Sequence, residues 1–138
     1  MSRLDFGDRF TKYVDKRDYR NVRRYLNTYV FNFQVYNKAV YVSIIKEDDK
    51  MFNILTSDII VMYNLTFDCC YYIMTHKNNY EKRGSEKDYL HYIKRLISLR
   101  PEIFNGISPR DMELLEMYKQ LSRLKKLYRI RKKTLKQN

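Results

Sequence analysis

The chain has 138 residues, 44% of them hydrophobic, with a formal net charge of +12 and only three glycines and two prolines. This length suits a single domain with a buried core, and the low Gly and Pro content argues against a loop-rich or disordered chain. The two cysteines are adjacent (Cys69 and Cys70), which excludes a disulfide framework and favours a reducing compartment, nuclear or cytoplasmic.

The first predicted element is an amphipathic helix over residues 5–26. Its apolar residues recur at spacings of three and four, which is the periodicity of one helix face. Asp15 and Asp18 lie among its cations and can form local ion pairs with them. Even so, the basic face is a candidate for part of a nucleic-acid-binding surface. Its predicted contacts are Arg17, Arg20, Arg23 and Arg24.

The next segment, residues 28–55, predicts a small antiparallel β-hairpin or meander. Apolar and polar residues alternate over residues 28–36, and a β-branched apolar run follows. Asn37-Lys38 lies between them as a two-residue turn. Residues 51–55 are predicted to form a third short strand after an acidic turn. A hairpin alone is barely stable in water, so this element has to pack on neighbouring helices.

A central helix is predicted over residues 58–75. Thr56-Ser57-Asp58 supplies side-chain oxygens for its N-cap, and its apolar residues occupy nearly the whole circumference, as expected of a buried helix. Its apolar run is shorter than the ~20 residues of a membrane span, and Asn64 and Asp68 are among the polar residues that interrupt it. We therefore expect no membrane partner.

Two further helices complete the prediction. Ser85 and Asp88 resemble a capping box for a helix that ends before Pro101. Ser108-Pro109 is a favourable start for the last helix, because Ser is a good N-cap and Pro suits the first helical position. That helix reaches about Leu135, a length of about 40 Å. Neither an internal repeat nor a low-complexity linker is evident.

The last sixteen residues carry eight cations and no acid, which is two thirds of the net charge of the chain. A density of this kind is typical of contact with a polyanion, above all nucleic acid. The cations are expected to surround the helix, so binding would be salt-dependent and largely insensitive to sequence. The predicted contacts are Arg123, Lys125, Lys126, Arg129, Arg131, Lys132, Lys133 and Lys136.

The same residues allow two other interpretations. Lys125-Lys126 and Arg131-Lys132-Lys133 are basic clusters of the kind that nuclear import receptors bind. The last helix also carries an apolar stripe at spacings of three and four, which is suited to pairing with a second copy or a partner helix. That stripe consists of Leu114, Met117, Leu121, Leu124 and Tyr128.

Catalytic and metal-binding motifs receive little support. Cys69, Cys70, His76 and His91 lack the spacing of a zinc site, so we predict two small buried cysteines and no metal. The glycines are isolated and form no phosphate-binding loop, and no nucleophile elbow is present. We expect a non-enzymatic protein with no cofactor.

Residues 35–64 are similar in outline to the hairpin-then-helix core of viral BRO and KilA-type DNA-binding domains. The aromatic and glycine motifs of that family are missing, so no residue roles are transferred. The richness in Asn, Lys, Ile and Tyr also resembles that of small proteins of AT-rich large DNA viruses. The resemblance in outline slightly favours DNA binding, and the composition adds nothing to it.

The sequence thus predicts an α+β fold: a predominantly helical single domain over residues 1–122, and a basic helical extension over residues 123–138. The expected function is binding of nucleic acid through basic helices with low sequence specificity, in the nucleus or the cytoplasm. The alternative is a homo-oligomer or protein-interaction factor that uses the apolar stripe, with the basic tail as a nuclear import signal.

Overall fold

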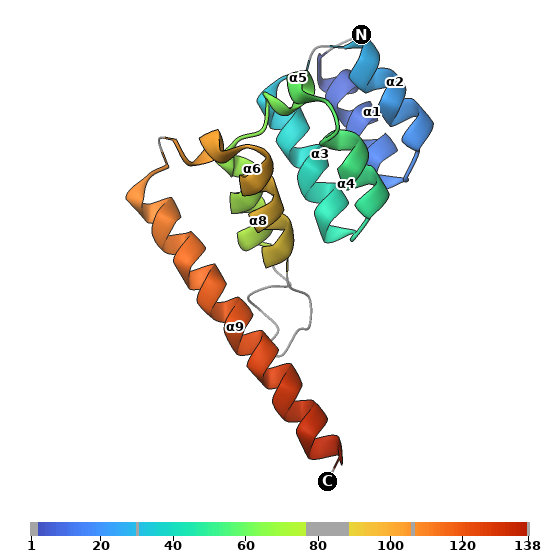
Figure 1. Cartoon of the computed structure of the whole chain (residues 1–138). Coiled ribbons are helices and arrows are strands. Elements are labelled where there is room, and N and C mark those ends of the chain that lie inside the picture. The colour runs from blue at the N-terminus through green and yellow to red at the C-terminus, as the bar shows by residue number, and fades with distance from the viewer. Residues whose placement is uncertain (1–2, 30, 77–88, 106, 138) are drawn as a thin grey trace. The chain divides into compact units, whose positions relative to one another are not determined.

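The computed structural model describes residues 3–29, 31–76, 89–105 and 107–137, and every regular element in these ranges is a helix (Figure 1). The chain divides into two compact units, residues 1–70 (unit 1) and residues 71–138 (unit 2). Each unit is described by itself. Within the described residues, none of the helices combines the length and the apolar content needed to cross a bilayer.

Unit 1 is built around four helices, each of which contacts two others. α1 packs on α2 and α3, and α4 packs on α3 and α2. Their apolar faces meet in a core from which water is excluded, and this burial is the main stabilising term of such a bundle. The helices of unit 1 are α1 (Arg3–Asp15), α2 (Tyr19–Thr28), α3 (Phe33–Ile45), α4 (Asp49–Leu55), α5 (Ile59–Met62) and the beginning of α6 (Phe67–Met74). The most deeply buried side chains of the core include Phe10, Val22, Tyr36, Val40, Ile44, Met51, Phe52 and Leu55.

The predicted α+β class is wrong, because the described part of residues 28–55 contains helices and no strand. The run that was expected to form β-strands forms α3. Its residues Tyr36, Ala39, Val40 and Ile44 recur at spacings of three and four, and all four are fully buried. The same apolar run fits both periods, and packing against α1 and α4 selects the helix.

The predicted hairpin turn at Asn37 lies in the middle of α3, and its side chain is fully buried. Its amide nitrogen donates hydrogen bonds to the carbonyl oxygens of Phe33 (2.6 Å) and Asn64 (3.0 Å). Its amide oxygen accepts a hydrogen bond from the N–H of Thr66 at 3.0 Å. Asn37 therefore clamps the segment between α5 and α6 onto α3, and a buried amide of this kind is costly to remove.

The predicted continuous helix over residues 58–75 is divided by this clamp. α5 begins directly after Asp58, which agrees with the predicted start, but it ends at Met62. α6 begins only at Phe67. The intervening segment gives its backbone groups at Asn64 and Thr66 to Asn37, so these groups are satisfied without a continuous helix.

The predicted helix over residues 5–26 is also two helices, α1 and α2. The break is at Arg17, which has a positive φ of 60°. The N–H of Asp18 donates to the carbonyl of Tyr13 (2.8 Å), and the N–H of Arg17 donates to that of Val14 (3.2 Å). These two bonds are those of a Schellman motif, which ends α1. Asp18 then caps α2, because its carboxylate accepts the N–H of Asn21 at 3.3 Å.

The same arrangement recurs thirty residues later, between α3 and α4. Glu47 has a φ of 56°, and the N–H of Asp48 donates to the carbonyl of Ser43 at 2.9 Å. Asp48 caps α4 by accepting the N–H of Met51 at 3.1 Å. Unit 1 thus contains two helical hairpins with the same Lys-x-Asp connection. The sequence pattern did not reveal this repeat, because the flanking residues share hydrophobicity and not identity.

These corrections remove the outline on which the BRO and KilA resemblance depended. The described part of residues 35–64 forms α3, α4 and α5 and has no hairpin of strands. A helix in place of a strand changes which residues face the core, so the resemblance carries no further weight.

Unit 2 contains α8 (Leu90–Leu99), the 3₁₀ helix η1 (Pro101–Phe104) and α9 (Pro109–Gln137). α8 ends before Pro101, as predicted. The N-cap of α9 is confirmed as well, since Ser108 Oγ accepts the N–H of Asp111 at 3.1 Å. The predicted capping pair Ser85 and Asp88 lies outside the described residues.

α9 packs on α8, and the buried side chains among its described residues all lie in its first half. Leu115 and Tyr118 are each 2% exposed, and the hydroxyl oxygen of Tyr118 accepts the N–H of Tyr89 at 3.2 Å. Ser122 is the last buried residue among the described side chains of α9. The boundary between a domain and an extension at residue 122 stays a prediction.

Candidate functional site

The basic end of α9 is the first candidate site. Beyond Ser122, every side chain that the structure describes is exposed to solvent. No acid follows Glu116 in the sequence, so the chain offers this region no intrahelical ion pair across its last five turns. The predicted contacts with described, exposed side chains are Arg123, Lys126, Arg131 and Lys133.

The helical register places most of these cations on one side of α9, although the sequence predicted that they surround the helix. Each residue of an α-helix is rotated by about 100° from the one before it. The row that is buried earlier in α9, at Leu115, Tyr118 and Ser122, therefore continues through positions 125, 129, 132 and 136. Positions 126 and 133 lie beside this row. Six of the eight cations thus fall within about one third of the circumference, so they do not surround the helix evenly.

The predicted partner stripe lies on a different side of α9. Leu114 and Leu121 are half-buried, whereas Met117 and Leu124 are 56% and 62% exposed. The side chain of Tyr128 is outside the described set. Two apolar residues that were not predicted, Leu127 and Ile130, are also more than 60% exposed. They could have been found by continuing the apolar spacing of three residues beyond Leu124.

The arginines of α2 form the second predicted basic surface, and the structure separates their roles. Arg17 lies in the connection before α2, with its Nε 3.7 Å from a carboxylate oxygen of Asp48. The guanidinium of Arg24 lies over the ring of Tyr25 at 5.7 Å. Arg20 and Arg23 are exposed on a helix that contains no acid. Arg17 is thus engaged in holding the two hairpins together.

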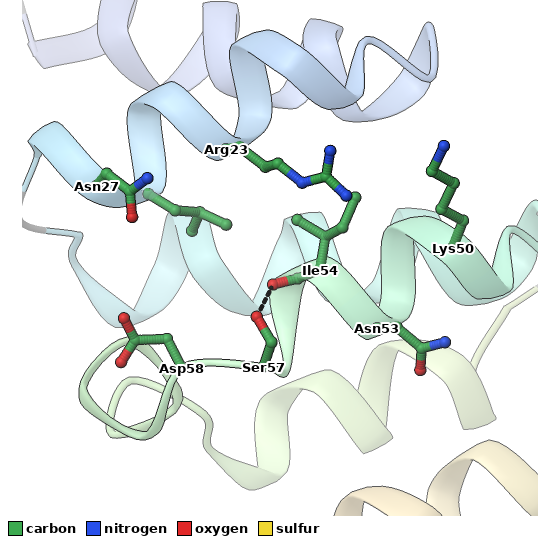
Figure 2. Close-up of a pocket in the computed structure, with 8 residues that line it drawn as sticks. Arg23, Asn27, Lys50, Asn53, Ile54, Ser57 and Asp58 are labelled. Carbon is green, nitrogen blue, oxygen red and sulfur yellow. Dashed lines mark hydrogen bonds between the residues drawn. The ribbon is translucent and has the colours of Figure 1, made fainter.

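Arg23 borders a cleft between α2 and α4 that the sequence did not predict (Figure 2). The cleft has a volume of about 670 Å³, which is within the usual range for small-molecule sites. Since α4 was expected to be a strand, the facing residues Lys50, Asn53 and Ile54 were missed. Their spacing of three and four would have indicated a shared face if the segment had been treated as a helix. The lining residues are Arg23, Leu26, Asn27, Lys50, Asn53, Ile54, Ser57 and Asp58.

A fixed tyrosine supports the cationic side of this cleft. The ammonium of Lys50 lies 4.5 Å from the ring centroid of Tyr19. The hydroxyl of Tyr19 donates to the Asp48 carboxylate, 3.1 Å from each oxygen. Desolvation raises the pKa of the Tyr19 phenol, and the hydrogen bond to Asp48 adds to this shift. Tyr19 therefore stays neutral at physiological pH, and its ring provides a cation–π contact for Lys50.

The two cysteines lie side by side on α6, and both are buried. Burial raises the pKa of the Cys70 thiol to about 12, and it raises that of Cys69 as well. Both thiols are consequently protonated at neutral pH and poor as nucleophiles. In the part of the chain that the structure describes, His, Cys, Asp and Glu form no group of three that could hold a metal ion.

Comparisons of this chain with models of protein families, with curated proteins and with solved structures found no match. Its function therefore has to be inferred from its own residues. Two features can bind a ligand: the exposed basic end of α9 and the polar cleft between α2 and α4. They belong to different units, and they differ in shape and in the ligands that suit them.

Proposed function

We propose that this protein is a non-enzymatic nucleic-acid-binding protein and that the basic end of α9 makes its main contact. The carrying observation is a row of cation positions along one side of α9, in a stretch without a single acid where every described side chain is exposed. Binding would neutralise phosphates and release their counterions, which gives an affinity with strong salt dependence and little sequence preference. Arg side chains in this row can also bond phosphate oxygens bidentately.

The sidedness of the cations supports an extended polymer as the partner. Six cation positions along one side of the last four turns allow several phosphates of one strand to be neutralised together. A folded acidic protein would need a complementary row of carboxylates of the same length. Nucleic acid provides such a row in any sequence, so it is the partner that we favour.

The test is binding of labelled DNA and RNA oligonucleotides over a salt series from about 50 to 200 mM. Replacing five tail cations by alanine should lower affinity about equally for all sequences and reduce the slope of log affinity against log salt by about 4 for duplex DNA. Fluorescence anisotropy measures both quantities. The five positions are Lys125, Lys126, Arg131, Lys132 and Lys133.

A matched control removes the same charge elsewhere. Five exposed cations outside both basic regions can be replaced by alanine, which lowers the net charge equally and leaves the tail intact. This control should keep most of the affinity and the salt slope. Equal losses of affinity in both variants would mean that binding depends on the net charge and not on the tail. Unchanged binding in the tail variant would refute the proposal. The control positions are Lys12, Lys16, Lys38, Lys94 and Arg110.

An assembly role is the second candidate, and the exposure of Met117, Leu124 and Leu127 favours it. Large apolar residues grouped on an exposed helix are typical of a protein–protein contact. In this case the stripe pairs with a second copy or a partner helix, and the basic tail serves as a nuclear import signal. Sedimentation of protein freed of nucleic acid separates the two: a stable oligomer that ignores added DNA would favour assembly.

A further inference from the structure

The cleft between α2 and α4 has an apolar floor and polar walls. Ile54 is buried at 8% exposure and Leu26 is half-buried, and these two side chains form the floor. The remaining lining residues are all exposed to solvent. An apolar floor with a few polar groups around it is the usual construction of a small-molecule site.

The polar groups are divided along the cleft. Arg23 and Lys50 extend toward one end, and Asn27 and Asp58 lie toward the other (Figure 2). Ser57 donates its hydroxyl to the carbonyl of Ile54 at 2.9 Å, which holds the Ser57 side chain against the end of α4. A ligand of this cleft therefore needs an anionic group at one end and hydrogen-bonding groups at the other.

The cationic end suits a phosphate group. An arginine from one helix and a lysine from the facing helix supply a forked donor and a compact point charge, the two cations that proteins use for phosphate. The ring of Tyr19 lies under Lys50, and Asp48 fixes that ring. The ammonium is thereby held beside the cleft, and α2 contributes no acid that would neutralise this end.

The other end suits a nucleobase. Ile54 offers an apolar surface on which a flat ring can lie, and the side-chain amide of Asn27 provides both donors and an acceptor. The carboxylate of Asp58 lies at the same end of the cleft as Asn27 (Figure 2). We propose that the α2–α4 cleft binds a nucleoside phosphate, with the phosphate between Arg23 and Lys50 and the base over Ile54.

This inference stands apart from the contact of α9 with nucleic acid, because it uses residues of unit 1 only. The phosphate can belong to a free nucleotide or to the end of a nucleic acid strand, and the chemistry that the cleft recognises is the same. The experiment therefore includes both sources of phosphate. It measures binding to the cleft with ligands that are too short to extend along the row of cations on α9.

The test is calorimetric titration of the full chain with nucleoside monophosphates, with the corresponding nucleosides and with inorganic phosphate. Saturable binding of the monophosphate is expected, with at least tenfold weaker binding of each separate part. Arg23→Gln and Lys50→Gln should each weaken the monophosphate by about tenfold, because each removes a charge-assisted hydrogen bond. Lys38→Gln, an exposed lysine of α3 outside the cleft, is the control and should bind as the wild type does.

A second measurement uses the wild-type chain, so it does not depend on whether the variants fold. In the wild-type chain, the side-chain amide resonances of Asn27 should shift during the nucleotide titration. Competition by a short oligonucleotide with a 5′-phosphate, and not by its unphosphorylated form, would assign the site to a strand end; no competition would assign it to a free nucleotide. Nucleoside and monophosphate binding equally, or unshifted amides at saturation, would overturn the proposal.

Discussion

α2 and the last half of α9 are both strongly cationic helices without acids, yet the two are held very differently. α2 has a buried face, with Val22 fully buried and Tyr25 5% exposed, and its Arg23 lines the cleft that faces α4. Beyond Ser122, the described side chains of α9 have no buried face. Charge density alone therefore does not define a site. Cations on a helix with a buried face can position a small ligand, whereas cations on a helix end without a buried face suit a long polymer.

The largest effect should come from the two halves of α9. Leu115→Ala should lower the free energy of unfolding by about 3 kcal/mol, because it opens a cavity in a buried contact. Leu124→Ala, on the same helix but 62% exposed, should change it by less than about 0.5 kcal/mol. Urea denaturation followed by circular dichroism measures both values. Equal losses would mean that the end of α9 is packed in solution, as the assembly alternative requires.

The next effect concerns the carboxylate that joins the two hairpins of unit 1. Asp48→Ala removes the cap of α4, the acceptor of Tyr19 and the partner of Arg17 together, so a loss of about 2 to 3 kcal/mol is expected. The exposed neighbour is the control, and Asp49→Ala should cost only a few tenths of a kcal/mol. A result below about 1 kcal/mol for Asp48→Ala would show that the two hairpins are not joined through this group.

The smallest effect should be a gain in stability. Glu47 adopts a left-handed conformation at φ 56° and is exposed, so Glu47→Gly relieves backbone strain at little cost in contacts. An increase of about 0.5 to 1 kcal/mol in the free energy of unfolding is expected, and Glu47→Ala should give no such gain. Thermal unfolding of the pair of variants measures the difference. A loss with glycine would exclude the Schellman geometry at this connection.

Local signals in the sequence were sufficient for the ends of several helices. Ser108 caps α9, α8 ends before Pro101, and α5 starts after Asp58. Each signal acts through backbone groups within a few residues, so it is readable without knowledge of distant contacts. The break at Arg17 was missed because no glycine marks it. The Schellman motif there forms on a non-glycine residue, for which a positive φ is energetically unfavourable.

The sequence by itself determined where the positive charge lies. Eight cations and no acid stand at the end of α9, and the N-cap residue Ser108 marks the start of that helix. It did not determine whether residues 28–55 are strands or helices, because their apolar run satisfies both periods. Only the tertiary structure decided this, since burial of Tyr36, Val40 and Ile44 against neighbouring helices outweighs a small difference in local propensity. The cleft between α2 and α4 exists only as a consequence of that choice, because residues far apart in the chain face each other only after packing.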